Sequence, residues 1–122
     1  MNGNQILQRA LTLMGYTDQN GDIDSEAARS ANRHGLAAVR QIYSELSYAS
    51  GTAPSTITDM SMPLPLSRRL LDEVMPYGVA MLLAIAEGDT NTEAAFALIY
   101  NRKRGLLTTT EQRSDALPRN IA

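Results

Sequence analysis

The 122-residue chain has no cysteine and no tryptophan, and it contains a single histidine and a single phenylalanine. Without cysteine it can form no disulfide and no zinc–thiolate site, and it has no thiol nucleophile. One histidine removes most nucleophile–base pairs, and no glycine-rich phosphate loop or Gly-Lys-Ser/Thr sequence occurs. We therefore expect no catalytic residues, no cofactor and no metal, and we predict that the protein is not an enzyme.

The net charge of the chain is also small, and its most apolar stretch is short. A charge of −2 at pH 7 gives no global field that would draw the protein to DNA, although a local basic patch stays compatible with it. The most apolar stretch, residues 74–86, is shorter than the roughly 20 residues that a membrane-spanning helix needs. The N-terminus also lacks the pattern of a secretory signal. We expect a soluble protein without membrane contact.

The positive charge is carried by ten arginines and one lysine, Lys103. The planar guanidinium suits bidentate contacts with carboxylates or phosphates. This bias raises the odds of protein interfaces slightly, although codon usage or chance explains it more simply.

Apolar residues recur every three to four positions in four segments, which predicts an all-α bundle of four to five helices. The expected helices cover residues 4–14, 25–47, about 67–87, and 90–107. Pro76 lacks a backbone donor, so the third region should kink or break near residues 72–76. Gly15 and Gly88 should end the first and third helices. Because the third helix is apolar on every side, we predict that it is the buried centre of the bundle.

The fourth helix has a clear start signal, since Thr90-Asn-Thr-Glu93 matches a capping box. The short connection before it requires the third and fourth helices to run antiparallel. Its basic residues 102–104 are expected to form a solvated helix end that complements the helix dipole, with a phosphate contact as the alternative. Five apolar residues are expected to face the central helix, with Phe96 and Tyr100 beside them: Ala94, Ala95, Leu98, Ile99 and Leu106.

Four polar residues alternate after the first helix like the start of a calcium loop: Asp18, Asn20, Asp22 and Asp24. The sixth position of that loop is Ile23 instead of glycine, and the twelfth is Arg29 instead of glutamate. We therefore expect a turn at Asn20-Gly21 and a helix cap at Asp24. The lone histidine, His34, has no ligating neighbours and is expected at the surface or at a boundary.

Residues 48–66 contain three prolines and show no helical period, so we predict a long irregular loop between the second and third helices. Ile57, Met60 and Met62 alternate with polar residues. A short β-arm that covers a neighbouring subunit fits this pattern, and an ordinary connection packed on its own domain fits it equally. The bundle should occupy residues 1–107, followed by a tail, residues 108–122, that is flexible or docked on a partner.

The order of these features carries a family resemblance over most of residues 4–107. The segments that carry it are Leu13-Met-Gly-Tyr-Thr-Asp18, Gln41-Ile-Tyr-Ser-Glu-Leu46, Met62-Pro-Leu-Pro-Leu66, the run from Leu71 to Ala84, Glu87-Gly-Asp89 and Tyr100-Asn-Arg-Lys-Arg104. They resemble small proteins from the head-morphogenesis clusters of tailed phages and prophages of Gram-positive bacteria. More distantly, they resemble the head–tail connector (adaptor or head-completion) proteins of long-tailed phages.

The resemblance implies a structural role in the virion neck, reached after assembly in the host cytoplasm. Such connectors self-associate into a ring on the portal protein, contact neck or tail-completion proteins, and let DNA pass without specific binding. Long loops and C-terminal tails usually make these contacts, which points here to six residues: Ile57, Met60, Met62, Arg113, Leu117 and Arg119. The alternative is a helical adaptor with no phage role that binds a protein partner through residues 48–66.

Overall fold

The computed structural model describes residues 1–17, 20, 22 and 25–120; within its helices, side chains are described up to residue 107, except at position 27. The fold is all-α, as predicted, and no strand occurs among the described residues. The helical elements are α1 (Gly3–Leu13), α2 (Ser25–Ala49), the π-helical turn η1 (Leu70–Val74), α3 (Met75–Glu87) and α4 (Thr90–Asn120). In place of the β-arm, an isolated antiparallel bridge joins Asn2 and Pro63.

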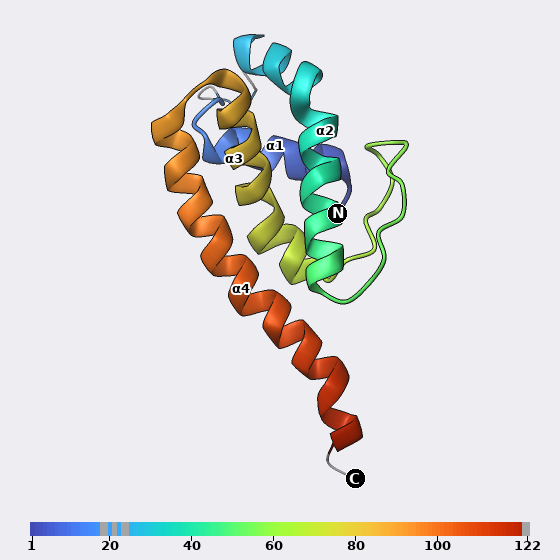
Figure 1. The fold of residues 1–122 in the computed structure, drawn as a ribbon. Helices are drawn as coiled ribbons and strands as arrows, with labels where there is room; N and C mark the ends of the chain where they lie inside the picture. The colour runs from blue at the N-terminus through green and yellow to red at the C-terminus, as the bar shows by residue number, and fades with distance from the viewer. Residues whose placement is uncertain (18–19, 21, 23–24, 121–122) are drawn as a thin grey trace.

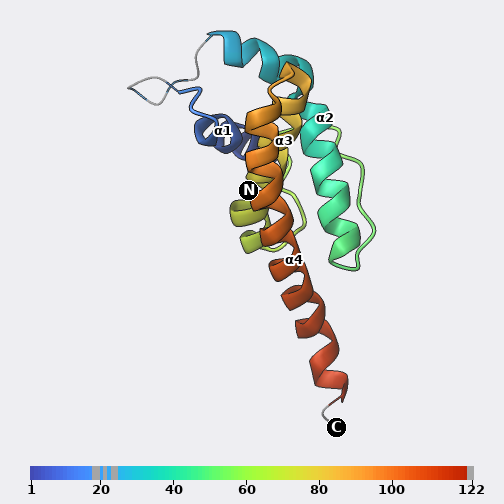
Figure 2. The ribbon, with the colours of Figure 1, turned by 60° about the vertical axis from the view of Figure 1, so that its left-hand side comes forward.

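The central position predicted for the third helix is confirmed. In both ribbon views α3 lies between α4 and α2, and α1 lies behind it in the view of Figure 1 (Figures 1 and 2). Val79 and Leu83 are fully buried, whereas Ile85 near the end of the helix is 51% exposed. One side of α3 is therefore buried along its length, and the other side is half-buried at Met81 and Leu82 and exposed at Ile85.

Two predicted glycine caps are confirmed by positive φ angles, 82° at Gly15 and 73° at Gly88. After α3, the Gly88 N–H donates to the Ile85 carbonyl (3.1 Å) and the Asp89 N–H to the Ala84 carbonyl (3.0 Å). This pair of bonds is the Schellman arrangement, which glycine favours because its left-handed position has no Cβ clash.

The irregularity predicted before Pro76 takes the form of η1. The Met75 N–H donates to the carbonyl of Leu70, five residues earlier, which is the π-helical spacing. Pro76 has no N–H for the carbonyl of Asp72, so ordinary α-helical bonding cannot continue through it. Three side chains of the turn are buried in the core, which fixes the turn in place: Leu70, Leu71 and Val74.

The cap predicted at Thr90 is wrong. Asp89 caps α4 instead: its carboxylate accepts from the N–H (3.1 Å) and the hydroxyl (2.6 Å) of Thr92, and its carbonyl accepts from the Glu93 N–H (3.0 Å). Asp89 directly follows the αL glycine, so its side chain reaches the first turn while Thr90 is already helical.

The face predicted for α4 is also wrong. All five apolar residues expected against α3 are exposed, whereas Phe96 and Tyr100, which were expected beside them, face the core together with Leu107. Tyr100 lies against Gly78, where an added Cβ would be 2.8 Å from its ring carbon Cε1. The aromatic residues bury more surface than alanines and single leucines would, so they determine the rotation of the helix.

The length of α4 differs from the prediction as well. The helix does not stop near residue 107, where the apolar pattern ends, but continues to Asn120. The basic residues 102–104 therefore lie in the middle of a helix, and the helix-end explanation for them is wrong. His34 is exposed, as expected. Of the calcium-loop positions, residues 18 and 24 lie outside the described residues, as does Gly21 of the predicted turn.

Candidate interaction surfaces

The outer face of α4 carries an apolar stripe, which we call the α4 stripe. Leu98 and Leu106 are each 65% exposed and Ile99 is 37% exposed. Ala94 and Ala95 are also exposed and precede them by about one turn. Single exposed leucines are ordinary, but here several exposed apolar residues share one helix face, with the exposed Arg102 between Ile99 and Leu106; such groups occur at interaction sites.

The opposite face of α4 is held by a half-buried polar cluster. The Tyr100 hydroxyl donates to Glu45 Oε1 (3.2 Å), and Arg104 Nη1 pairs with the same oxygen (3.2 Å). The Arg104 guanidinium also lies 5.2 Å from the centre of the Tyr100 ring. Burial and then the charge of Glu45 raise the pKa of Tyr100 well above its ordinary value, so the phenol stays neutral and remains a donor.

A second set of contacts joins α4 to the start of α3. The rings of Tyr77 and Phe96 are 6.2 Å apart and tilted by 45°, and the Lys103 ammonium lies 5.0 Å from the centre of the Tyr77 ring. Together with the cluster around Glu45, these contacts fix the rotation of α4 over about two turns. The α4 stripe is therefore presented to solvent by specific packing on the other side of the helix.

The last part of α4 extends beyond the rest of the molecule. The two ribbon views agree that the helix continues past the ends of α2 and α3 with no other element beside it (Figures 1 and 2). Three predicted interface residues belong to this extension: Arg113, Leu117 and Arg119. Their side chains lie outside the described residues, so only the helical backbone that carries them is placed.

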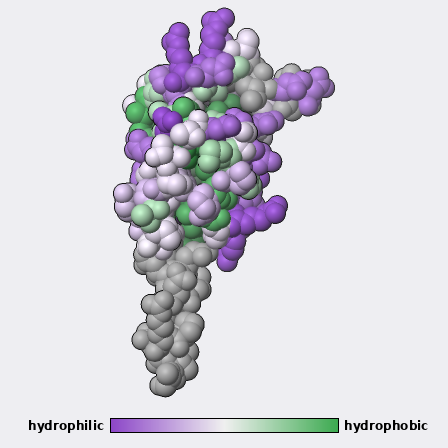
Figure 3. Space-filling view, turned by 90° about the vertical axis from the view of Figure 1, so that its right-hand side faces the viewer, coloured by the Kyte–Doolittle hydropathy of each residue, from purple (hydrophilic) through white to green (hydrophobic). Residues whose placement is uncertain are grey.

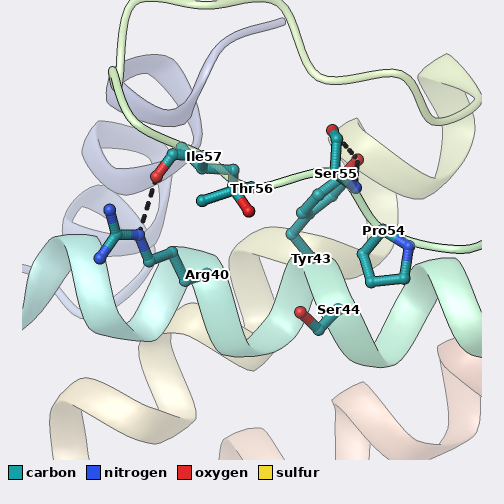
Figure 4. Close-up of a pocket in the computed structure, with 7 residues that line it drawn as sticks. All are labelled: Arg40, Tyr43, Ser44, Pro54, Ser55, Thr56 and Ile57. Atoms are coloured by element: carbon teal, nitrogen blue, oxygen red, sulfur yellow. Dashed lines mark hydrogen bonds between the residues drawn. The ribbon is translucent and has the colours of Figure 1, made fainter.

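The loop between α2 and η1 packs on its own domain. Arg40 Nε donates to the Ile57 carbonyl (2.9 Å), and the Tyr43 hydroxyl is 3.0 Å from the Ser55 hydroxyl (Figure 4). Between these two anchors the loop and α2 enclose a hollow of about 220 Å³. Of the two readings left open by the sequence, the structure shows the connection packed on its own domain.

The three loop residues predicted as an interface are placed very differently. Ile57 is buried (4% exposed) in the core of its own chain. Met60 is half-buried against α1, and its carbonyl accepts from the Asn4 N–H (3.0 Å). Met62 is 43% exposed and is the member of the three that a partner can reach in this fold.

The face that contains α2 and the loop shows hydrophobic residues in separate patches among hydrophilic ones (Figure 3).

No group of three or more His, Cys, Asp or Glu side chains suited to a metal occurs within the described part of the chain. No helix in that part is long and apolar enough to cross a membrane. Comparison of the chain with protein-family models, with curated proteins and with solved structures finds no match.

Proposed function

We propose that the protein is a structural component of a tailed phage or prophage: a head–tail connector that assembles as a ring on the portal and links the DNA-filled head to the neck or tail. The observation that carries the proposal is the α4 stripe together with the helical extension that follows it. The family resemblance over most of residues 4–107 suggests the class of assembly.

The extension favours a partner for an energetic reason. Its 13 residues beyond residue 107 continue α4 without packing against another element of the described chain, and most helical stability in proteins comes from tertiary packing. A helix that leaves the body at this length gains stability when another chain covers it. The apolar character of the α4 stripe suits the desolvated centre of a protein interface, where charged residues are depleted.

In this proposal the contacts to other copies, to the portal and to neck or tail-completion proteins come from the α4 stripe, the extension and Met62. Within the extension, Arg113, Leu117 and Arg119 are the residues proposed to make these contacts. DNA passes through the ring without specific recognition. The protein acts in the virion neck after assembly in the host cytoplasm, and its role is mechanical.

Deletion of residues 108–122 tests the proposal. The described core lies within residues 1–107, so the truncated chain should keep its helical circular dichroism and its cooperative thermal unfolding. It should no longer appear on portal rings in negative-stain electron micrographs, whereas the full chain should. Equal decoration of the portal by both chains would exclude docking through the extension.

The alternative, an adaptor with no phage role that binds through residues 48–66, is favoured by one observation. Tyr48 (68% exposed) and Met62 (43% exposed) stand near the two ends of the loop. Partner binding that is lost on Tyr48→Ala and Met62→Ala, but is kept by the chain without residues 108–122, would select this alternative.

A further inference from the structure

Three arginines follow one exposed face of α2: Arg29, Arg33 and Arg40. We call them the arginine track. Intervals of four and seven residues keep their directions within about 40° of one another on an α-helix with 3.6 residues per turn. At a rise of 1.5 Å per residue, the track extends for about 16 Å along the helix axis.

The arginine track has no acidic partners among the described residues, a property that it shares with Arg68 and Arg102. Three arginines elsewhere form ion pairs, namely Arg9 with Asp72 (3.2 Å), Arg69 with Glu73 (3.7 Å) and Arg104 with Glu45 (3.2 Å). Within the described part of the chain, no carboxylate forms an ion pair with the arginine track. Its first two members stand four residues apart, a spacing at which like charges destabilise a helix. An external anion would remove that repulsion.

Two hollows lie along the track. Arg29 and Arg33 line a hollow of about 410 Å³ between the start of α2 and the end of α3. Arg40 lines the hollow of about 220 Å³ beneath the loop, and its Nε bond to the Ile57 carbonyl fixes the plane of its guanidinium (Figure 4). Both terminal nitrogens of Arg40 then remain available, since none of the described residues accepts from them.

Two acids border the first hollow. Glu26 is exposed in the first turn of α2, and the Glu87 carboxylate accepts from the Tyr16 hydroxyl (2.7 Å). Figure 3 shows the side of the molecule that carries α2 and the loop, where hydrophilic side chains project from the surface. The three arginines carry a formal charge of +3, and the two carboxylates at the first hollow, Glu26 and Glu87, reduce the local sum to +1, so the excess positive charge lies toward Arg40.

We propose that the arginine track binds the phosphate backbone of nucleic acid without sequence preference. A guanidinium forms two parallel hydrogen bonds with a phosphate, and such pairs are stronger than bonds between neutral groups. A DNA strand carries a phosphate about every 3.4 Å along its axis, so a straight track of about 16 Å can contact several phosphates of one backbone. Because the net charge of the chain is −2, the protein as a whole does not attract nucleic acid, and binding depends on the local charge of the track. The inference is independent of the connector proposal.

Fluorescence anisotropy of a labelled duplex of about 24 base pairs, titrated with the full chain at about 20 to 200 mM salt, tests the inference. Three neutralised phosphates predict a slope of about −2.7 for log K against log salt. The triple variant Arg29→Gln, Arg33→Gln, Arg40→Gln should lose binding. The double variant Arg29→Gln, Arg33→Gln keeps the bond from Arg40 to the loop, and its slope should fall to about −0.9.

Matched controls separate the track from general charge. Arg68 and Arg102 are exposed and lie off α2, and neither forms an ion pair within the described residues. The double variant Arg68→Gln, Arg102→Gln should bind like the wild type. Glu26→Gln should bind more tightly, because it removes the acid beside Arg29.

Three results would overturn the inference. They are no anisotropy change at the lowest salt, equal losses in the track and control variants, and tighter binding of polyglutamate than of DNA of matched charge. The last result would identify an acidic protein as the partner. The assay needs no portal, so a failure of ring assembly and a failure of DNA binding are observed separately.

Discussion

At Gly78, α2, α3 and α4 approach one another so closely that no side chain fits between them. An added Cβ would lie 2.8 Å from Tyr100 Cε1 and 2.9 Å from Ile42 Cδ1. We expect Gly78→Ala to destabilise the protein by about 1–3 kcal/mol, because the overpacking outweighs the better helix propensity of alanine. Urea unfolding measures this change.

Gly105 provides the control for Gly78. It lies in α4, and an added Cβ would meet no atom within 4 Å. Gly105→Ala should stabilise the protein by about 0.5–1 kcal/mol through helix propensity alone. Equal effects of the two substitutions would contradict the close approach at Gly78.

Asp89 gives a pH-dependent prediction. Hydrogen bonds from the Thr92 hydroxyl and N–H lower the pKa of Asp89 below its ordinary value. Stability from a lowered pKa is present above the unfolded-state pKa of about 4 and is lost as the pH falls through the folded-state value. We expect Asp89→Ala to lower the thermal midpoint at pH 7, and the difference from wild type to shrink below about pH 4.

Thr90→Ala is the control for the cap. Its side chain makes no bond to the first turn of α4 among the interactions of the described residues, so the midpoint should change little at any pH. A larger loss for Thr90→Ala than for Asp89→Ala would restore the capping box predicted from the sequence.

The structural roles of single residues that act through the backbone could be predicted from the sequence. Gly15, Gly88 and Pro76 act through φ angles or a missing donor, and these properties belong to the residue itself. The choice between Asp89 and Thr90 could not be made this way, because both are good cap residues and one position decides it. The predicted cap was therefore wrong by one residue.

On the scale of the element, the rotation of α4 was the main error. Both sides of this helix are apolar, so periodicity alone could not select the buried one. The available signal was the spacing of Phe96, Tyr100 and Leu107 combined with a glycine on the facing helix. Packing of an aromatic ring against Gly78 decides the rotation, and it leaves the leucines of the α4 stripe outside.

This rotation predicts how substitutions in α4 differ. Leu98→Ser with Leu106→Ser should lower the free energy of unfolding by only about 1 kcal/mol in total, from helix propensity. Tyr100→Ala should cost about 3–5 kcal/mol, as large-to-small changes of buried aromatics do. Chemical denaturation compares them. A loss of several kcal/mol at each leucine would place the α4 stripe in the core, as the sequence alone predicts.

The loop between α2 and η1 shows the same limit of sequence reasoning. Ile57 is buried and Met62 is exposed. In an extended chain, residues that are an odd number of positions apart lie on opposite sides, so Ile57 and Met62 do not share a side. The pattern does not say which of the two sides packs on the chain's own domain and which one faces a partner. The bond from Arg40 to the Ile57 carbonyl and the contact between the Tyr43 and Ser55 hydroxyls hold this part of the loop on α2, which places Ile57 in the core of its own chain.

For the whole molecule, the sequence predicted the class of fold and the central position of α3, because both follow from apolar periodicity and length. It did not predict the interaction surfaces, which depend on which side chains remain exposed once the core has packed. In the folded protein the α4 stripe, the extension of α4, Met62 and the arginine track all face outward. These features fit a protein whose role is to contact large partners.

The most direct measurement is sedimentation velocity of the portal ring mixed with the full chain. The connector proposal predicts a single species that is heavier than the portal by a fixed number of copies of the chain. When the two proteins are mixed in that ratio, the boundary of the free chain should disappear. A portal that sediments unchanged beside a folded, unbound chain, at concentrations well above those of the virion assembly reaction, would contradict it.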